Sequence, residues 1–148
     1  MTQWIAEHWF DLLQTIGIVG GLSFTAYATR KDEKARKIGN LIAINAQYQK
    51  IWKEFYRHSE LARVLKPDAD IATTPVTEIE KRFVISLILH LNTVYHAMKE
   101  GMFVPIEGLQ KDVRNFFSLP IPRSMWEKNR VFQNADFVRF VEKSIGTV

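Results

Sequence analysis

The stretch that decides the predicted fold is Leu12–Thr29, LLQTIGIVGGLSFTAYAT, which contains no charged residue. As a helix, a stretch of this length spans roughly 27 Å, close to the ~30 Å hydrocarbon core of a bilayer. The sequence therefore predicts a transmembrane helix that ends near Thr29. Residues 1–29 are expected to form an extracytoplasmic tip and this helix, and residues 30–148 a cytoplasmic helical domain.

Basic residues lie on one side of this stretch. All 20 Lys and Arg residues follow Thr29, whereas residues 1–11 carry only the acidic Glu7 and Asp11. Residues 30–148 therefore have a net charge of 20 minus 14, or +6. Because flanks rich in Lys and Arg stay on the cytoplasmic side, the sequence predicts a single-pass membrane protein with its N-terminus outside and its large domain in the cytoplasm.

Aromatic and basic side chains flank the predicted span. Trp and Tyr favour the membrane interface, and Lys and Arg favour anionic headgroups. The expected interface residues are Trp4, Trp9, Tyr27, Arg30, Lys31 and Lys34. Two alternatives to a membrane span stay open. One is a cleaved signal peptide, since Ala26-Tyr27-Ala28 has the form of a cleavage site. The other is a helix buried in a water-soluble core. A signal peptide needs a basic leading region, which residues 1–11 do not have. The glycines of the stretch disfavour a helix in a water-soluble core.

Small and polar residues share one face of the predicted helix. Gly17 and Gly21 are four residues apart, which lets a second backbone approach closely. Unpaired polar groups in hydrocarbon are costly, so this face should meet another subunit or a central opening. The expected self-association or pore-lining residues are Asp11, Gln14, Gly17, Gly21 and Thr25. The alternative is that glycines are common in membrane helices and that Gln14 reaches the headgroups.

The remaining sequence predicts helices and no strand. Apolar residues recur at spacings of three and four between Leu41 and Phe55, which is typical of an amphipathic helix. Further helices are expected over residues 59–65, from Thr74-Pro75 to Gly101, over residues 107–117, from Pro122, and over residues 136–145, the last one capped by Asn134. The predicted fold is all-α, with a transmembrane helix continuing into a cytoplasmic helical bundle.

The sequence holds few residues typical of catalysis. The chain has no cysteine, which excludes disulfides and zinc sites built on thiolates. It has no glycine-rich phosphate loop, no Gly-x-Ser-x-Gly elbow and no His-Glu-x-x-His motif. His90 and His96 are six residues apart and do not share a helix face, so they predict no metal site. No catalytic residue, cofactor or enzymatic activity is predicted.

The stretch Asp112–Arg123, DVRNFFSLPIPR, followed by Trp126, resembles a group of uncharacterised small bacterial single-span membrane proteins. The anchor and the Arg-Lys-rich segment after it share in this resemblance. It implies a location in the bacterial inner (cell) membrane and no activity. In its architecture the chain also resembles the membrane accessory protein of type VI-B CRISPR systems. That resemblance implies a ring-shaped pore and a role in phage defence.

Three functions remain as expectations. The first is a membrane protein that self-associates through its transmembrane helix, as a homo-oligomeric pore or defence effector. The second is a membrane-tethered adaptor that recruits a cytoplasmic protein through an apolar patch around residues 116–126. The third is a divergent ribonuclease, because Arg82 and His90 resemble the arginine and histidine of HEPN ribonucleases, although seven residues separate them here, more than in that family. The expected partners are the lipid bilayer, a second copy and a cytoplasmic protein, but not nucleic acid.

Overall fold

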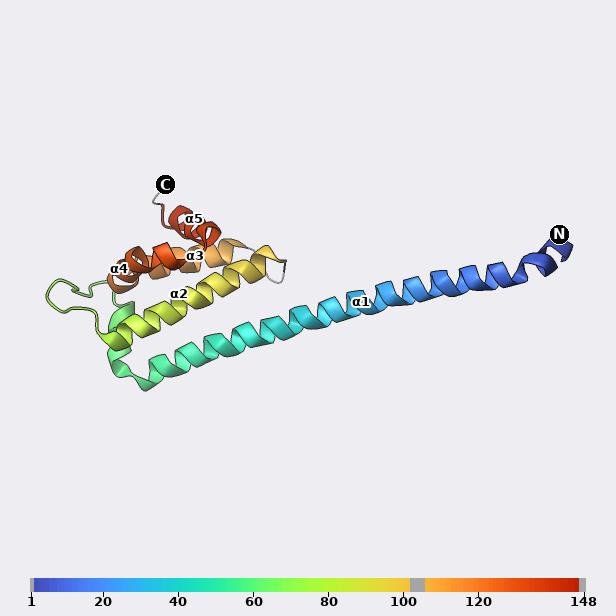
Figure 1. Cartoon of the computed structure of the whole chain (residues 1–148). Helices are drawn as coiled ribbons and strands as arrows, with labels where there is room; N and C mark the ends of the chain where they lie inside the picture. Colours follow the sequence, from blue (N-terminus) through green and yellow to red (C-terminus); the bar gives the residue numbers. More distant parts are fainter. Residues whose placement is uncertain (1, 102–105, 147–148) are drawn as a thin grey trace. The chain divides into compact units, whose positions relative to one another are not determined.

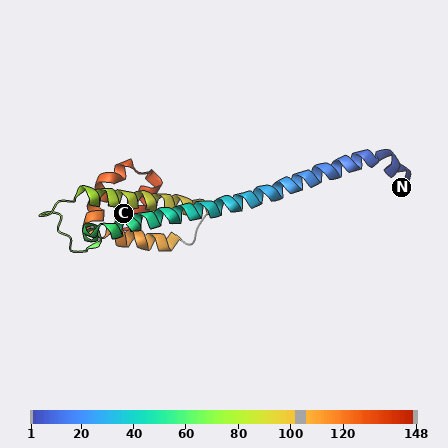
Figure 2. The same ribbon diagram turned by 90° about the horizontal axis from the view of Figure 1, so that it is seen from below.

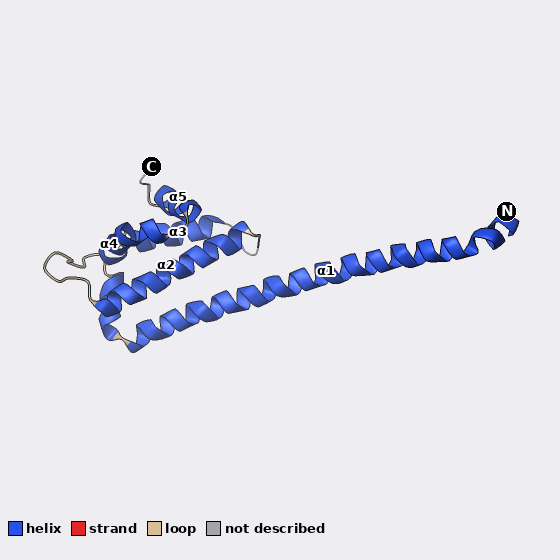
Figure 3. Ribbon diagram, in the orientation of Figure 1, coloured by secondary structure: helices blue, strands red, loops and turns tan. Residues whose placement is uncertain are grey.

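The computed structural model describes residues 2–101 and 106–146, and the side chains of residues 14–15, 17–101 and 108–146. The chain divides into two compact units, residues 1–40 and residues 41–148. All regular secondary structure in the described ranges is helical (Figures 1 and 3). The prediction of an all-α helical bundle is thereby confirmed.

Five α-helices and two 3-10 helices (η) follow one another along the described ranges. They are α1 (Thr2–Arg57), η1 (Ser59–Leu65), α2 (Glu78–Lys99), α3 (Ile106–Phe117), α4 (Pro120–Asn129), η2 (Arg130–Phe132) and α5 (Ala135–Ser144). The first unit consists of the beginning of α1. The second unit holds the end of α1 and all the other helices.

The predicted membrane span is wrong. Among the helices of the described residues, none has an apolar stretch long enough to cross a membrane. The side chains of Leu12, Leu13 and Ile16 lie outside the described set, and eight of the eighteen residues in Leu12–Thr29 are Gly, Ser, Thr or Gln. These residues lower the mean hydropathy of a segment that merely lacks charge. The prediction of a single-pass protein of the bacterial inner membrane, with an external N-terminus and a cytoplasmic bundle, is corrected accordingly.

Helix α2 is the central element of the second unit. Helices η1, α3, α4 and α5 all contact it, and Figures 1 and 2 show these helices gathered around it. It begins at Glu78 and not at the expected Thr74-Pro75. The cap is Thr77, whose hydroxyl accepts the Glu80 backbone N–H at 3.3 Å, while the Glu80 carboxylate accepts the Thr77 backbone N–H at 2.8 Å. This reciprocal capping box satisfies two otherwise unpaired donors.

The core of the second unit is aromatic. Trp126 of α4 is 1% exposed and lies between two phenylalanines, with ring centroids 5.1 Å from Phe117 of α3 and 5.8 Å from Phe137 of α5. The indole N–H of Trp126 donates to the Glu142 carboxylate at 3.0 Å. Three helices thus meet at one side chain, which explains why the expected apolar surface around residues 116–126 is largely interior.

The end of α1 packs along α2 in the antiparallel direction. The rings of Phe55 and Phe83 have centroids 5.4 Å apart, and seven residues earlier on α1 the ring of Tyr48 lies 5.4 Å from that of His90. As the contact moves back along α1, it moves forward along α2. Ile51, between these two contacts, is buried.

One arginine organises the segment between η1 and α2. The Arg63 guanidinium donates to both carboxylate oxygens of Glu80, at 3.2 and 3.1 Å, and Glu80 is only 2% exposed. The same guanidinium also donates to three backbone carbonyls, which are those of Asp70, at 2.8 Å, Thr74 and Pro75. Backbone carbonyls that have no helical partner are therefore satisfied by a side chain.

Candidate functional site

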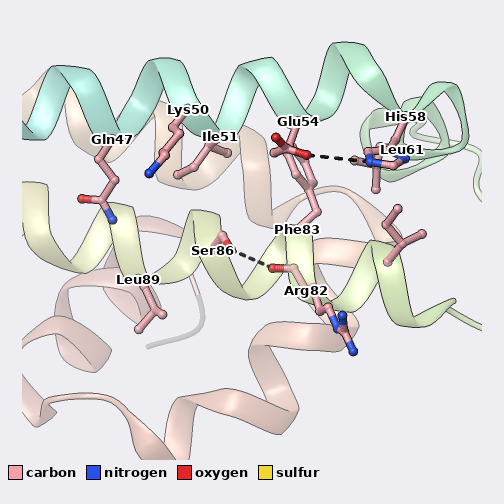
Figure 4. A pocket seen from close by; sticks show the side chains of 11 residues that line it. Gln47, Lys50, Ile51, Glu54, His58, Leu61, Arg82, Phe83, Ser86 and Leu89 are labelled. Atoms are coloured by element: carbon pink, nitrogen blue, oxygen red, sulfur yellow. Dashed lines mark hydrogen bonds and ion pairs between the residues drawn. The ribbon is translucent and has the colours of Figure 1, made fainter.

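A groove runs between the end of α1 and the first half of α2, with a volume of about 370 Å³ (Figure 4). The residues that line it recur at spacings of three and four on each helix, as expected for one face of each. They are Gln47, Lys50, Ile51, Glu54 and His58 from α1 and the turn after it, Leu61 from η1, and Ile79, Arg82, Phe83, Ser86 and Leu89 from α2.

The floor of the groove is apolar. Ile51, Leu61 and Phe83 are each less than a tenth exposed and belong to the core of the bundle. Leu89 also lines the groove but is 48% exposed. A leucine this open beside a buried floor leaves apolar surface available to a ligand.

The rim of the groove carries more positive than negative charge. Glu54 is already engaged, because its carboxylate lies 3.1 Å from the Arg57 guanidinium and 3.8 Å from the His58 ring. Neither Lys50 nor Arg82 forms an ion pair with a described carboxylate, although the pKa of Glu78 is lowered by its hydrogen bond with Lys81 and, less strongly, by the charge of Arg82. In Figure 4, Lys50 points from α1 toward α2. The groove therefore combines an apolar floor with two lining cations, Lys50 and Arg82.

Ser86 supplies a hydroxyl group to the lining of this groove, but its hydrogen already forms a hydrogen bond. It donates to the backbone carbonyl of Arg82 at 2.9 Å, as Figure 4 shows. No base approaches it among the contacts of the described side chains, so nothing activates it as a nucleophile. Within the same described residues, no cluster of His, Asp and Glu is arranged to hold a metal ion.

Comparisons with protein families, curated proteins and solved structures find no match to this chain.

The structure does not bring Arg82 and His90 into one site. Arg82 is exposed at the groove, whereas His90 is 6% exposed and lies against the ring of Tyr48. The two residues are eight positions apart on α2, which corresponds to a rise of about 12 Å. The arginine and histidine of the HEPN resemblance therefore have no shared position at which they could hold one phosphodiester.

His90 gives the bundle a predicted pH dependence. Burial lowers the pKa of His90 below its ordinary value of 6.5, and its Nδ1 has no hydrogen-bond partner among the described atoms. Near and below pH 6.5 the unfolded chain binds a proton more readily than the folded chain does. The contribution of the neutral His90 to the free energy of unfolding is therefore fully present above pH 6.5. It is lost as the pH falls through the lowered pKa of His90 in the folded state.

We expect the free energy of unfolding, measured by urea titration monitored by circular dichroism, to decrease as the pH falls below 6.5. His90→Phe should flatten this decrease, because the variant has no group to protonate at that site. His58→Phe, at a side chain 41% exposed, is the control and should keep it. An unchanged pH dependence in His90→Phe would contradict the assignment.

The stripe predicted for self-association remains a prediction. Asp11 and the interface candidates Trp4 and Trp9 have side chains outside the described set. Gln14 is exposed, and a Cβ placed on Gly17 or Gly21 would meet nothing within 4 Å. The remaining candidates, Thr25, Tyr27, Arg30, Lys31 and Lys34, are all exposed, and the Thr25 hydroxyl donates to the Gly21 carbonyl at 2.9 Å.

Sequence reasoning missed the groove. Its two walls are more than twenty residues apart in sequence, between Glu54 and Ile79, so no local motif joins them. The available signal was the polar face of the helix over residues 47–58, where Lys50 and Glu54 are one turn apart. That pattern alone indicates an ordinary solvated face.

Proposed function

We propose that this chain is a helical adaptor that binds an acidic amphipathic helix of a partner protein in the groove between α1 and α2. The observation that carries the proposal is the combination of a buried apolar floor with two cations, Lys50 and Arg82, that line the same groove. An apolar face on the partner would cover the floor, and carboxylates beside that face would lie against the cations.

The shape of the groove favours a helix. Both walls are antiparallel helices, and their lining residues cover residues 47–58 and 79–89. At about 1.5 Å per residue this gives a length of roughly 16 Å, which corresponds to about three helical turns. Side chains at i, i+3, i+4 and i+7 of a third helix fit the spacing of the ridges on two packed helices.

The test uses a synthetic helical peptide of about four turns, with leucines at i, i+3, i+4 and i+7 and glutamates on both flanks. Fluorescence anisotropy measures its binding to the full chain. We expect the glutamate peptide to bind and a version with lysines in place of the glutamates to bind at least about tenfold more weakly. Raising the salt concentration should narrow that difference.

Two matched variants locate the site. Ser86→Trp places a large side chain in the groove and should weaken binding by roughly tenfold or more. Thr93→Trp is the control, because Thr93 is also exposed on α2 and also bonds to the carbonyl four residues earlier, but does not line the groove. Equal affinity for both peptides, or equal effects of the two variants, would refute the proposal.

A further inference from the structure

One segment of this chain has the properties that the groove between α1 and α2 requires of a partner helix. The acidic segment, residues 2–16, belongs to α1 and has the sequence TQWIAEHWFDLLQTI. Its charged residues are Glu7 and Asp11, a net charge of −2 with histidine neutral. Helices α2 to α5 are neutral or positive, because α2 has three basic and two acidic residues, α4 two and one, and α3 and α5 two of each. The acidic segment therefore complements a groove lined by Lys50 and Arg82.

The spacing of apolar residues gives the acidic segment an apolar face. Four of them recur at intervals of four, three and four residues, which is typical of one side of a helix. They are Ile5, Trp9, Leu12 and Ile16. Asp11 directly precedes Leu12 and so lies about 100° around the helix from it, at the edge of this face. Glu7 comes one turn before Asp11. Such a helix matches an apolar floor beside two cations.

The acidic segment also matches the groove in length and conformation. Ile5 and Ile16 are eleven positions apart, a rise of roughly 16 Å, and the walls of the groove have about the same length. The backbone over residues 2–16 is helical, as part of α1. A segment that is already helical binds without the cost of ordering a disordered chain. The chain therefore carries a preformed helix of suitable length.

We propose that the acidic segment of a second copy of this chain occupies the groove. The inference rests on the proposed function, and it names the partner helix. The occupant is a second copy because α1 runs unbroken from Thr2 to Arg57 and supplies one wall of the groove. The segment could reach the wall of its own chain only if this helix broke. Each copy offers one segment and one groove, so two copies that exchange segments form a closed dimer.

The first experiment measures the mass of the full chain by size-exclusion chromatography with light scattering over a series of micromolar concentrations. We expect twice the chain mass of 17.2 kDa. Two changes should each weaken the dimer at least about tenfold. Ser86→Trp fills the groove, and Glu7→Lys combined with Asp11→Lys reverses the charge of the acidic segment. A monomeric wild-type chain would overturn the proposal.

Each change has a matched control. Thr93→Trp adds the same side chain to α2 outside the groove. Asp32→Lys combined with Glu33→Lys changes the net charge of the chain by the same amount, at two exposed residues of α1 outside the acidic segment. Both controls should keep the mass of the wild-type chain. Equal weakening by a change and its control would place the contact elsewhere and contradict the proposal.

A mixture of the two weakened proteins tests the exchange of segments directly. The Ser86→Trp chain keeps an intact acidic segment, whereas the charge-reversed chain, with Glu7→Lys and Asp11→Lys, keeps an intact groove. Neither protein alone has a matched segment and groove, but the mixture regains one such contact. We expect the mixture to associate more tightly than either variant alone. If the mixture associates no more tightly, the segment does not bind the groove of another copy and the proposal fails.

The synthetic peptide of leucines and glutamates separates this inference from the proposed function. It should bind the charge-reversed chain, whose groove is then free, and an excess of it should dissociate the wild-type dimer. A wild-type chain that is monomeric but binds the peptide would overturn the inference and leave the proposed function standing. If the peptide does not bind the charge-reversed chain, both the inference and the proposed function are wrong.

Discussion

Replacing Arg63 with methionine is expected to destabilise the bundle by about 3 kcal/mol, near the lower end of the cost of breaking a buried ion pair. Methionine keeps the aliphatic volume but leaves the carboxylate of Glu80, which is 2% exposed, without its cation. The expected loss of stability is not larger because the Thr77 backbone N–H still donates to the Glu80 carboxylate at 2.8 Å. Urea unfolding monitored by circular dichroism measures the loss.

The matched control is Arg57→Met, which removes a similar pair from the surface. Arg57 and Glu54 have side chains 60% and 51% exposed, so their pair should contribute about 1 kcal/mol or less. The double variant Arg63→Met with Glu80→Gln should recover part of the stability, because no uncompensated charge remains. Equal losses in Arg63→Met and Arg57→Met would show that the Glu80 contact is not a buried ion pair in energetic terms.

Trp126→Ala is expected to cost about 3–5 kcal/mol, since it opens a cavity where three helices meet. The indole contacts Phe117 and Phe137, and all three rings are at most 1% exposed. The marginal stability of single domains is only about 5–15 kcal/mol, so this variant should unfold at much lower urea concentrations. Circular dichroism during urea titration again gives the measurement.

Trp126→Phe separates the volume of the ring from its hydrogen bond. The phenyl ring fills most of the site but cannot donate to Glu142, whose carboxylate also accepts from Arg130 at 3.2 Å. We expect a smaller loss of about 1–2 kcal/mol. If the alanine and phenylalanine variants lost the same amount, the cavity would not be the main source of the cost.

Much of the helical pattern follows from local signals in the sequence. Asn134 was predicted to cap the last helix, and its side chain accepts the Asp136 backbone N–H at 2.8 Å. The start of α2 was placed three residues early because Thr74-Pro75 has the form of a helix start. The sequence Thr77-x-x-Glu80 carried the stronger signal, since a capping box satisfies two donors and a single cap only one.

The groove and the expected membrane span were harder to predict than the helices. The groove depends on contacts between residues far apart in the sequence, and a membrane span depends on the mean hydropathy of a whole segment. The groove is made by faces of α1 and α2 that only packing brings together, through contacts such as Phe55 with Phe83. The expectation of a span over Leu12–Thr29 rests on its length and its lack of charge, whereas the described helices hold no stretch apolar enough to span a membrane. Absence of charge and high hydropathy are separate properties, and only the second drives insertion into lipid.

The position of α5 has a consequence for synthesis. Phe137, Phe140 and Val141 fill the core from this helix, and its Ser144 carbonyl accepts from the Arg114 side chain of α3 at 2.9 Å. A nascent chain that has left the ribosome only as far as α4 therefore exposes an apolar hollow beside Trp126. The core can close only after α5 emerges, and until then the growing polypeptide exposes apolar surface of the kind that favours aggregation.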